Sequence, residues 1–108
     1  MGVALCPTIV YTNMEFEWDR HKSEGNFKKH KVRFDDAAPL FIQAGQFTYI
    51  SNHSGTDGVR YVTVGVLKGK LFAAVYTLRG DTIRIISVRR ARRGEEKKYR
   101  ELQFGRIH

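Results

Sequence analysis

The stretch VRYVTVGVLKGKLFAAVYTLRGDTIRIISV, residues 59–88, decides the fold. Apolar and β-branched residues recur along it at every second position, which is the period of a half-buried strand. Two tight turns, around Gly69 and Gly80, divide it into three strands, and turns this short join antiparallel neighbours. A fourth strand candidate, QFTYI at residues 46–50, precedes them across a polar loop. The sequence therefore predicts an antiparallel meander of three to four strands.

Helical patterns flank this meander on both sides. EFEWD, residues 15–19, predicts a short strand whose final aspartate occupies the N-cap position of a helix over residues 20–30. A second, short helix is expected in residues 32–41, where a proline limits its length. A last helix is expected at about residues 93–103, with apolar and polar side chains spaced by one turn. Helices segregated from an antiparallel sheet are typical of an α+β fold.

The chain of 108 residues is long enough for one domain. We predict an α+β domain over residues 14–108, with N-terminal helices, the meander sheet and a C-terminal helix, and a loose N-terminal extension over residues 1–13.

Cys6 is the single cysteine, which excludes an internal disulfide and favours a reducing cytoplasm. The 4 histidines lack metal-ligand spacing, and neither a targeting signal nor a long apolar run is recognised. The sequence thus predicts no metal, no cofactor and no membrane span.

Positive charge is concentrated in the last third of the chain. There are 19 Lys and Arg against 11 Asp and Glu, which gives a net charge of +8. Residues 1–75 contain nine basic and seven acidic side chains, hence +2, whereas residues 76–108 contain ten and four, hence +6. An excess of this size favours an anionic partner such as nucleic acid, an acidic protein or an anionic membrane surface.

The strand TIRIISVRR, residues 82–90, carries arginine among apolar residues. Strict alternation places Arg84 on one face and Arg89 on the other. A half-buried guanidinium needs a partner, because burying an unpaired charge is costly. One explanation is an internal ion pair with an acid: Asp35, Glu95 or Glu101. The other is a phosphate bound on an open sheet face, where Arg60 and Arg79 would converge near Arg84, and the number of arginines favours it.

The segment RRARRGEEKKYR, residues 89–100, also has two interpretations. Its charges form a solvated helix face, or they attract phosphate at long range. Glu95 and Tyr99 lie one helical turn apart, so this pair either packs and hydrogen-bonds or supplies a carboxylate base and a phenolic donor beside a phosphate. His30, at the end of the first predicted helix, is either a buried hydrogen-bonded residue or a proton-transfer group.

Three motifs occur in order along the chain: FEWD at residues 16–19 with the helix that follows it, HSGTDGVRYVTVG at residues 53–65, and VYTLRGDTIRIISVRRARRGEEKKYRE at residues 75–101. In this order they resemble the BrnT toxins of bacterial BrnT/BrnA toxin–antitoxin pairs, over about residues 15–102. Two positions depart from the family pattern. Lys31 stands where a helix-ending glycine is usual, and Arg92 replaces a threonine that caps the last helix.

The resemblance implies a RelE-like toxin fold and a cytoplasmic, metal-independent endoribonuclease that inhibits translation. It also implies neutralisation by a cognate BrnA-like antitoxin, a dimeric DNA-binding protein, so that the toxin would reach operator DNA only through its antitoxin. No membrane partner is expected. Two alternatives remain: a non-catalytic basic module that binds nucleic acid or protein, and a degenerate toxin that acts only as the antitoxin's partner.

The implied reaction is attack of an RNA 2′-hydroxyl on the adjacent phosphorus, which leaves a 2′,3′-cyclic phosphate and a free 5′-hydroxyl. Arginines are expected to hold the phosphate and stabilise its added charge. Glu95 is the candidate general base, with His30 as the alternative, and Tyr99 would orient the substrate or donate to the leaving oxygen. The predicted catalytic residues are Arg60, Arg84, Glu95, Tyr99 and His30. The predicted substrate-binding residues are Arg79, Arg89, Arg90 and Lys29.

Overall fold

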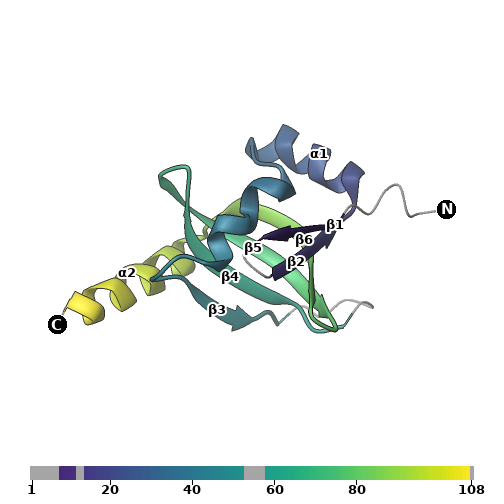
Figure 1. The fold of residues 1–108 in the computed structure, drawn as a ribbon. Coiled ribbons are helices and arrows are strands. Elements are labelled where there is room, and N and C mark those ends of the chain that lie inside the picture. The colour runs from purple at the N-terminus through teal and green to yellow at the C-terminus, as the bar shows by residue number, and fades with distance from the viewer. Residues whose placement is uncertain (1–7, 12–13, 53–57, 108) are drawn as a thin grey trace.

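The computed structural model describes residues 8–11, 14–52 and 58–107. The elements in chain order are β1 (Thr8–Tyr11), β2 (Met14–Trp18), α1 (Arg20–His30), the 3₁₀ helix η2 (Phe34–Phe41), β3 (Phe47–Ile50), β4 (Tyr61–Leu67), β5 (Lys70–Arg79), β6 (Thr82–Arg90) and α2 (Arg93–Ile107). Figure 1 shows α1 and η2 lying against the sheet, and α2 extending beyond it toward the C-terminus. Within the described part of the chain, no helix is both long and apolar enough to cross a membrane.

The sheet is mixed, with the strand order β1-β2-β6-β5-β4-β3. Strands β3 to β6 form the predicted antiparallel meander. The prediction of a purely antiparallel sheet of three to four strands is wrong, because β2 pairs with β6 in parallel and β1 adds to β2, which gives a 6-stranded sheet within the described residues. A parallel pair needs a long connection, and the chain between β2 and β6 contains two helices and three strands.

The N-terminal elements fit their sequence signals closely. Asp19 caps α1, since its Oδ1 accepts a hydrogen bond from the backbone N–H of Lys22 at 3.1 Å. The second predicted helix occurs as the 3₁₀ helix η2, which contains Pro39. Residues 8–11, within the predicted extension, form β1 against β2. The rest of that extension, together with His53 and Ser54 of the second motif, lies outside the described residues.

The main hydrophobic core lies between the sheet and the helices α1 and η2. Phe16 of β2 and Phe34 of η2 are each 1% exposed there, and aromatic and aliphatic side chains of β5 and β6 pack against them. A smaller apolar cluster lies on the opposite face of the sheet beneath α2. Its members are Val62, Val64 and Ala73, with Phe47, Val75, Ala91 and Tyr99 packed against them.

A β-bulge in β6 decides which arginines share a face of the sheet. The register between β5 and β6 moves by one residue between Val75 and Tyr76, which leaves Ile86 as an extra residue in β6. An extra residue shifts the alternation of side chains by one position. Arg84 and Arg89 therefore lie on the same face, and the prediction of opposite faces from strict alternation is wrong.

This second face, opposite the main core, carries polar side chains where α2 does not cover it. We call its polar part the open face. The pairing registers place the following residues on it: Glu17 of β2, Thr77 and Arg79 of β5, and Arg84, Ser87 and Arg89 of β6.

Asn26 fastens α1 to the sheet. Its side-chain Nδ2 donates to the carbonyl oxygens of Val32 at 2.8 Å and Val88 at 2.7 Å, and its Oδ1 accepts from the backbone N–H of Val88 at 3.1 Å. The residue is 7% exposed, so these three bonds are made away from water. A polar side chain can be buried on the inner side of α1 because all three bonds are satisfied.

The variant Asn26→Ala is expected to lower the free energy of unfolding by about 2–3 kcal/mol, because three buried backbone groups lose their partner. Urea unfolding followed by circular dichroism measures this loss. Gly25→Ala is the matched control, since the space around a Cβ at Gly25 is open and alanine is the better helix former. A loss below about 0.5 kcal/mol for Asn26→Ala, the size typical of a surface substitution, would contradict this role.

Candidate functional site

A row of functional side chains crosses the open face. Glu17 of β2 lies opposite Arg84 of β6, and Arg84 lies opposite Thr77 of β5. In the antiparallel register of β4 and β5, Tyr61 lies opposite Tyr76. Arg60, the residue before Tyr61, therefore lies opposite Thr77 and extends the row. The Thr77 hydroxyl donates to the carbonyl of the residue before Arg60 at 2.9 Å, which fixes this end of the row.

Arg79 and Arg84 converge on one carboxylate of this row. Nη1 of Arg84 lies 3.3 Å from Oε2 of Glu17, and Nη1 of Arg79 lies 3.7 Å from the same oxygen. The sequence predicted that Arg60 and Arg79 would converge near Arg84, and the structure brings Arg79 to the same carboxylate as Arg84. It also gives Arg84 an internal acidic partner, which was the first of the two explanations. The acid beside Arg84 is Glu17, which was not among the three acids that the sequence suggested. Two guanidinium groups around one carboxylate leave the open face positively charged.

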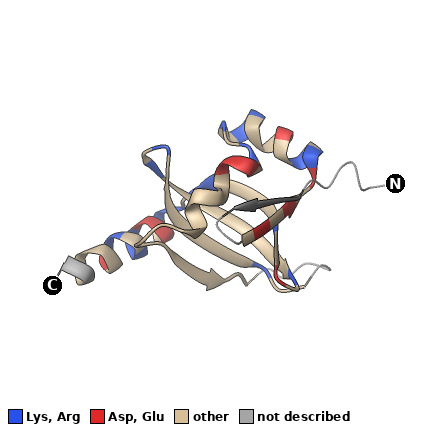
Figure 2. Ribbon diagram, in the orientation of Figure 1, with Lys and Arg blue, Asp and Glu red and all other residues tan. Residues whose placement is uncertain are grey.

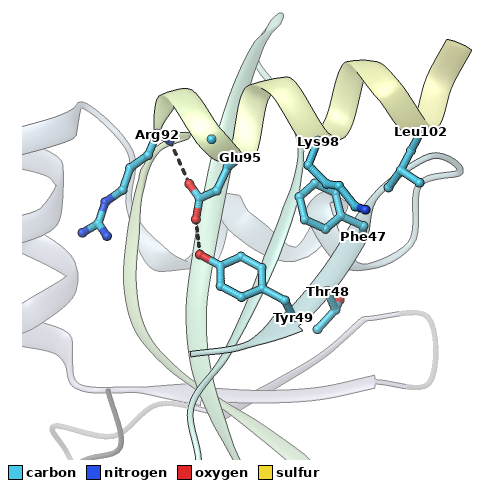
Figure 3. Close-up of a pocket in the computed structure, with 8 residues that line it drawn as sticks. Phe47, Thr48, Tyr49, Arg92, Glu95, Lys98 and Leu102 are labelled. Carbon is cyan, nitrogen blue, oxygen red and sulfur yellow. Dashed lines mark hydrogen bonds between the residues drawn. The ribbon is translucent and has the colours of Figure 1, made fainter. Parts of the chain in front are cut away.

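Arg89 is held by Glu95 at the start of α2. Its Nη1 and Nη2 donate to the two carboxylate oxygens of Glu95 at 2.8 and 2.9 Å, and the two side chains are 15% and 8% exposed. Figure 3 shows Glu95 pointing from α2 toward β3, where it also accepts a hydrogen bond from the hydroxyl of Tyr49. The paired fork of an arginine and a carboxylate is a strong and directional interaction. Glu95 therefore ties together β3, β6 and α2.

These hydrogen bonds also set the protonation state of Glu95. Burial acts to raise its pKa, but the bonds from Arg89, from the backbone N–H of Arg92 and from Tyr49 outweigh burial and lower the pKa to about 2. The same cluster raises the pKa of the Tyr49 hydroxyl, through burial first and then through its bond to Glu95. At neutral pH Glu95 is therefore a carboxylate and Tyr49 a neutral phenol.

The start of α2 explains how Arg92 replaces the capping threonine. The backbone N–H of Arg92 donates to Oε1 of Glu95, three residues later, at 2.8 Å. This is the glutamate half of a capping box, which needs no hydroxyl at the first position. This bond uses a backbone group, so it forms with arginine at position 92, where the resemblance led us to expect threonine.

An apolar groove of about 600 Å³ runs between β3 and α2 (Figure 3). Glu95 and Arg92 border one end, and Leu102 borders the other. Tyr99 lies one turn beyond Glu95 and packs, partly buried, against the smaller apolar cluster. The groove is thus a neighbour of the open face, and its lining is mainly apolar.

The remaining predicted site residues lie in a different place. Lys29, His30 and Arg90 border a second cavity, of about 300 Å³, at the C-terminal end of α1. Arg90 follows Arg89 in β6 and points to the other face of the sheet, since neighbouring residues of a strand alternate. The structure therefore places the predicted site residues in three places: on the open face, on α2 beside the groove, and in this second cavity, which we call the basic cavity.

The fold is a mixed sheet with α1 and η2 on one face and with arginine residues on the part of the other face that α2 does not cover. The chain matches the sequence model of a family described as the ribonuclease toxin BrnT of type II toxin-antitoxin systems, over residues 18–95. The match spans more than half of the chain, and the chain belongs to this family. It is thus a toxin of the ribonuclease type, as the three motifs predicted. A search of curated proteins finds no match for the chain.

Sequence reasoning did not select Glu17 or Tyr49. Glu17 lies within the FEWD motif, but its place beside Arg84 depends on the parallel pairing of β2 with β6. Tyr49 is one of two aromatic residues of a predicted strand, and only the packing of α2 over β3 brings it to Glu95. Glu17 could have been found from its motif, whereas Tyr49 has no local signal.

Proposed function

We propose that this toxin is an endoribonuclease that binds the scissile RNA phosphate on its open face. The observation that carries the proposal is the convergence of Arg79 and Arg84 beside Glu17, in a chain that belongs to a family of ribonuclease toxins. Guanidinium groups match the geometry of phosphate oxygens and keep their charge at any physiological pH. Arg60 extends the same row and would add to this positive field.

The chemistry follows from that placement. The 2′-hydroxyl of the RNA attacks the adjacent phosphorus, and the P–O bond to the next nucleotide breaks, which leaves a 2′,3′-cyclic phosphate and a free 5′-hydroxyl. The arginines stabilise the charge that gathers on the phosphate oxygens in the transition state. Arg89, fixed in direction by Glu95, would contribute from the end of the open face near α2.

For the group that accepts the proton of the 2′-hydroxyl, our proposal differs from the sequence prediction, which named Glu95 with His30 as the alternative. A pKa near 2 makes Glu95 a weak base, and we assign it the positioning of Arg89. His30 borders the basic cavity, on the other side of the sheet from Arg84. We therefore propose Glu17 as the group that accepts the proton of the 2′-hydroxyl, because it is the carboxylate of the arginine row. The role of Tyr99 as a donor stays a prediction.

The variant Glu17→Gln is expected to lower the maximal cleavage rate by about 100-fold, within the range for removal of a general base. RNA affinity should stay equal or increase, because a negative charge leaves the neighbourhood of Arg79 and Arg84. Single-turnover cleavage of a labelled RNA, together with binding of a 2′-O-methyl RNA that cannot be cleaved, separates the two quantities. Loss of affinity with an unchanged rate would assign Glu17 to structure alone.

In the cell, cleavage would take place in the cytoplasm and inhibit translation, and a cognate BrnA-like antitoxin would neutralise the toxin and link it to operator DNA. Membership in a type II toxin–antitoxin family supports these expectations. Purified protein incubated with RNA in EDTA tests the activity. Fragments that end in 2′,3′-cyclic phosphate are expected. Intact RNA would overturn the proposal in favour of a binding module or an inactive toxin.

A further inference from the structure

The basic cavity brings cationic side chains together from three separate elements. They come from the end of α1, from the β4–β5 turn and from the end of β6, and Figure 2 shows the blue β4–β5 turn and the blue C-terminal end of α1 above the same end of the sheet. The lining residues are Lys29, His30, Lys31, Val32, Lys68, Lys70, Phe72 and Arg90. Among the described residues, no Asp or Glu lines this cavity.

Two of these lysines occupy backbone positions that disfavour them. Lys31 ends α1 with φ 65°, and Lys68 has φ 54° in the turn between β4 and β5. Within the described part of the chain they are the two non-glycine residues with left-handed backbone, and both line the basic cavity. Glycine is preferred at the first position, and asparagine, aspartate or glycine at the second, where the paired residues Leu67 and Lys70 enclose a two-residue turn. Backbone strain gathered in one cavity points to a function of that cavity.

The contacts of the cationic side chains in the basic cavity do not neutralise their positive charge. Lys68 has a distant partner in Asp36, with Nζ 3.8 Å from Oδ2. The Asp36 Oδ2 also accepts a hydrogen bond from the backbone N–H of Arg33 at 3.0 Å, so this carboxylate is shared. The Arg90 guanidinium lies 5.6 Å from the centre of the Phe72 ring, and its Nε donates to the carbonyl of Leu71 at 3.3 Å. These contacts orient Arg90 and leave the cavity cationic.

The chemistry of the lining favours phosphate over peptide. The apolar residues of the cavity, Val32 and Phe72, are 1% and 4% exposed, so they offer little surface to the side chains of a docking peptide. What the cavity presents is ammonium and guanidinium groups, which bind phosphate oxygens. A peptide would find apolar anchoring surface in the groove between β3 and α2 instead.

We propose that the basic cavity is a second phosphate site, which binds the RNA backbone at a nucleotide away from the scissile one. This inference rests on the proposed function for its choice of RNA. Arg89 and Arg90 connect the two sites, since they are consecutive residues of β6 that face the open face and the basic cavity. An RNA strand that passes over the end of β6 contacts both. The lysines at left-handed positions thus favour substrate binding at the expense of backbone stability.

The double variant Lys31→Gly, Lys68→Asn tests the proposal, because its two expected effects have opposite signs. Each substitution installs the residue that its backbone conformation prefers, so the midpoint of thermal unfolding should rise by about 5 °C. Affinity for a 2′-O-methyl RNA of about ten nucleotides should fall by about 10-fold at low salt. The slope of log affinity against log salt should decrease by about 1.4, for two lost phosphate contacts.

The control is Lys22→Gln, Lys97→Gln, which removes the same charge from helix positions that line neither the basic cavity nor the groove between β3 and α2. It should change affinity by less than about 3-fold, because charges away from the bound RNA act only through the screened long-range field. Equal affinity of wild type and the Lys31→Gly, Lys68→Asn variant, or an equal loss in the control, would overturn the inference. If wild type binds RNA through the basic cavity but does not cleave it, the proposed ribonuclease function is wrong and the second phosphate site stands. If wild type cleaves RNA and the double variant binds it equally well, only the second phosphate site is wrong.

Discussion

Replacing Arg84 by alanine is expected to lower kcat/KM for RNA cleavage by about 100- to 1,000-fold. Arg84 lies at the centre of the row on the open face, opposite both Glu17 and Thr77. Loss of one preorganised donor to a developing charge typically has this effect on rate. Cleavage of a labelled RNA under substrate-limited conditions measures the ratio directly, and circular dichroism checks that the variant is folded.

Two further variants make this result specific. Arg84→Lys keeps the charge but loses the planar fork of donors, so it should recover only part of the rate. Arg100→Ala removes an equal charge from the exposed side of α2, where the ion pair with Glu96 at 4.0 Å is largely solvated, and should retain near-normal cleavage. A rate for Arg84→Ala within about 3-fold of the Arg100→Ala rate, too small for a lost transition-state donor, would remove the open face from the mechanism.

The second large effect concerns stability. Glu95→Ala is expected to lower the free energy of unfolding by about 3–5 kcal/mol, because it leaves the largely buried guanidinium of Arg89 without its carboxylate partner. That is a large fraction of the stability of a small domain. Urea unfolding at pH 7 measures the loss. The neighbouring variant Glu96→Ala, which removes a carboxylate from a more exposed ion pair, should cost below about 1 kcal/mol.

The depressed pKa of Glu95 also predicts a dependence on pH. Its folded-state pKa is about 2 against an ordinary value of 4.5, so its contribution to stability is present above pH 4.5 and is lost as pH falls toward 2. The difference corresponds to about 3 kcal/mol. Wild type should lose about this much more stability than Glu95→Gln between pH 5 and pH 2. Parallel pH profiles for the two proteins would contradict the strong pairing of Glu95 with Arg89.

The parts of the fold that the sequence predicts well are governed by local interactions. Asp19 predicts the start of α1, because its side chain caps a backbone N–H only three residues away. The turns at Gly69 and Gly80 predict the meander, because left-handed backbone in tight turns favours glycine. Both glycines have positive φ in the structure. The convergence of Arg79 and Arg84 follows from the same hairpin, so it could be predicted too.

The parts that could not be predicted depend on contacts between distant segments. The pairing of β2 with β6 brings Glu17 to Arg84 across 67 positions of sequence, and no local pattern encodes it. Tyr49 reaches Glu95 only because α2 folds back over β3. The bulge at Ile86 adds a residue without a glycine or proline to mark it, and so the faces of Arg84 and Arg89 were misassigned.

That bulge ties the position of Arg89 to the length of β6. A strand that kept Ile86 but lost the bulge would turn Arg89 toward the main core and Arg90 toward the open face, so the two arginines would exchange sites. Deleting Ile86 would have the opposite outcome, because it would remove the extra residue and leave Arg84 and Arg89 on the same face of a regular strand. For protein engineering and for aligning homologues, a one-residue gap at Ile86 is therefore compatible with the same arrangement of arginines.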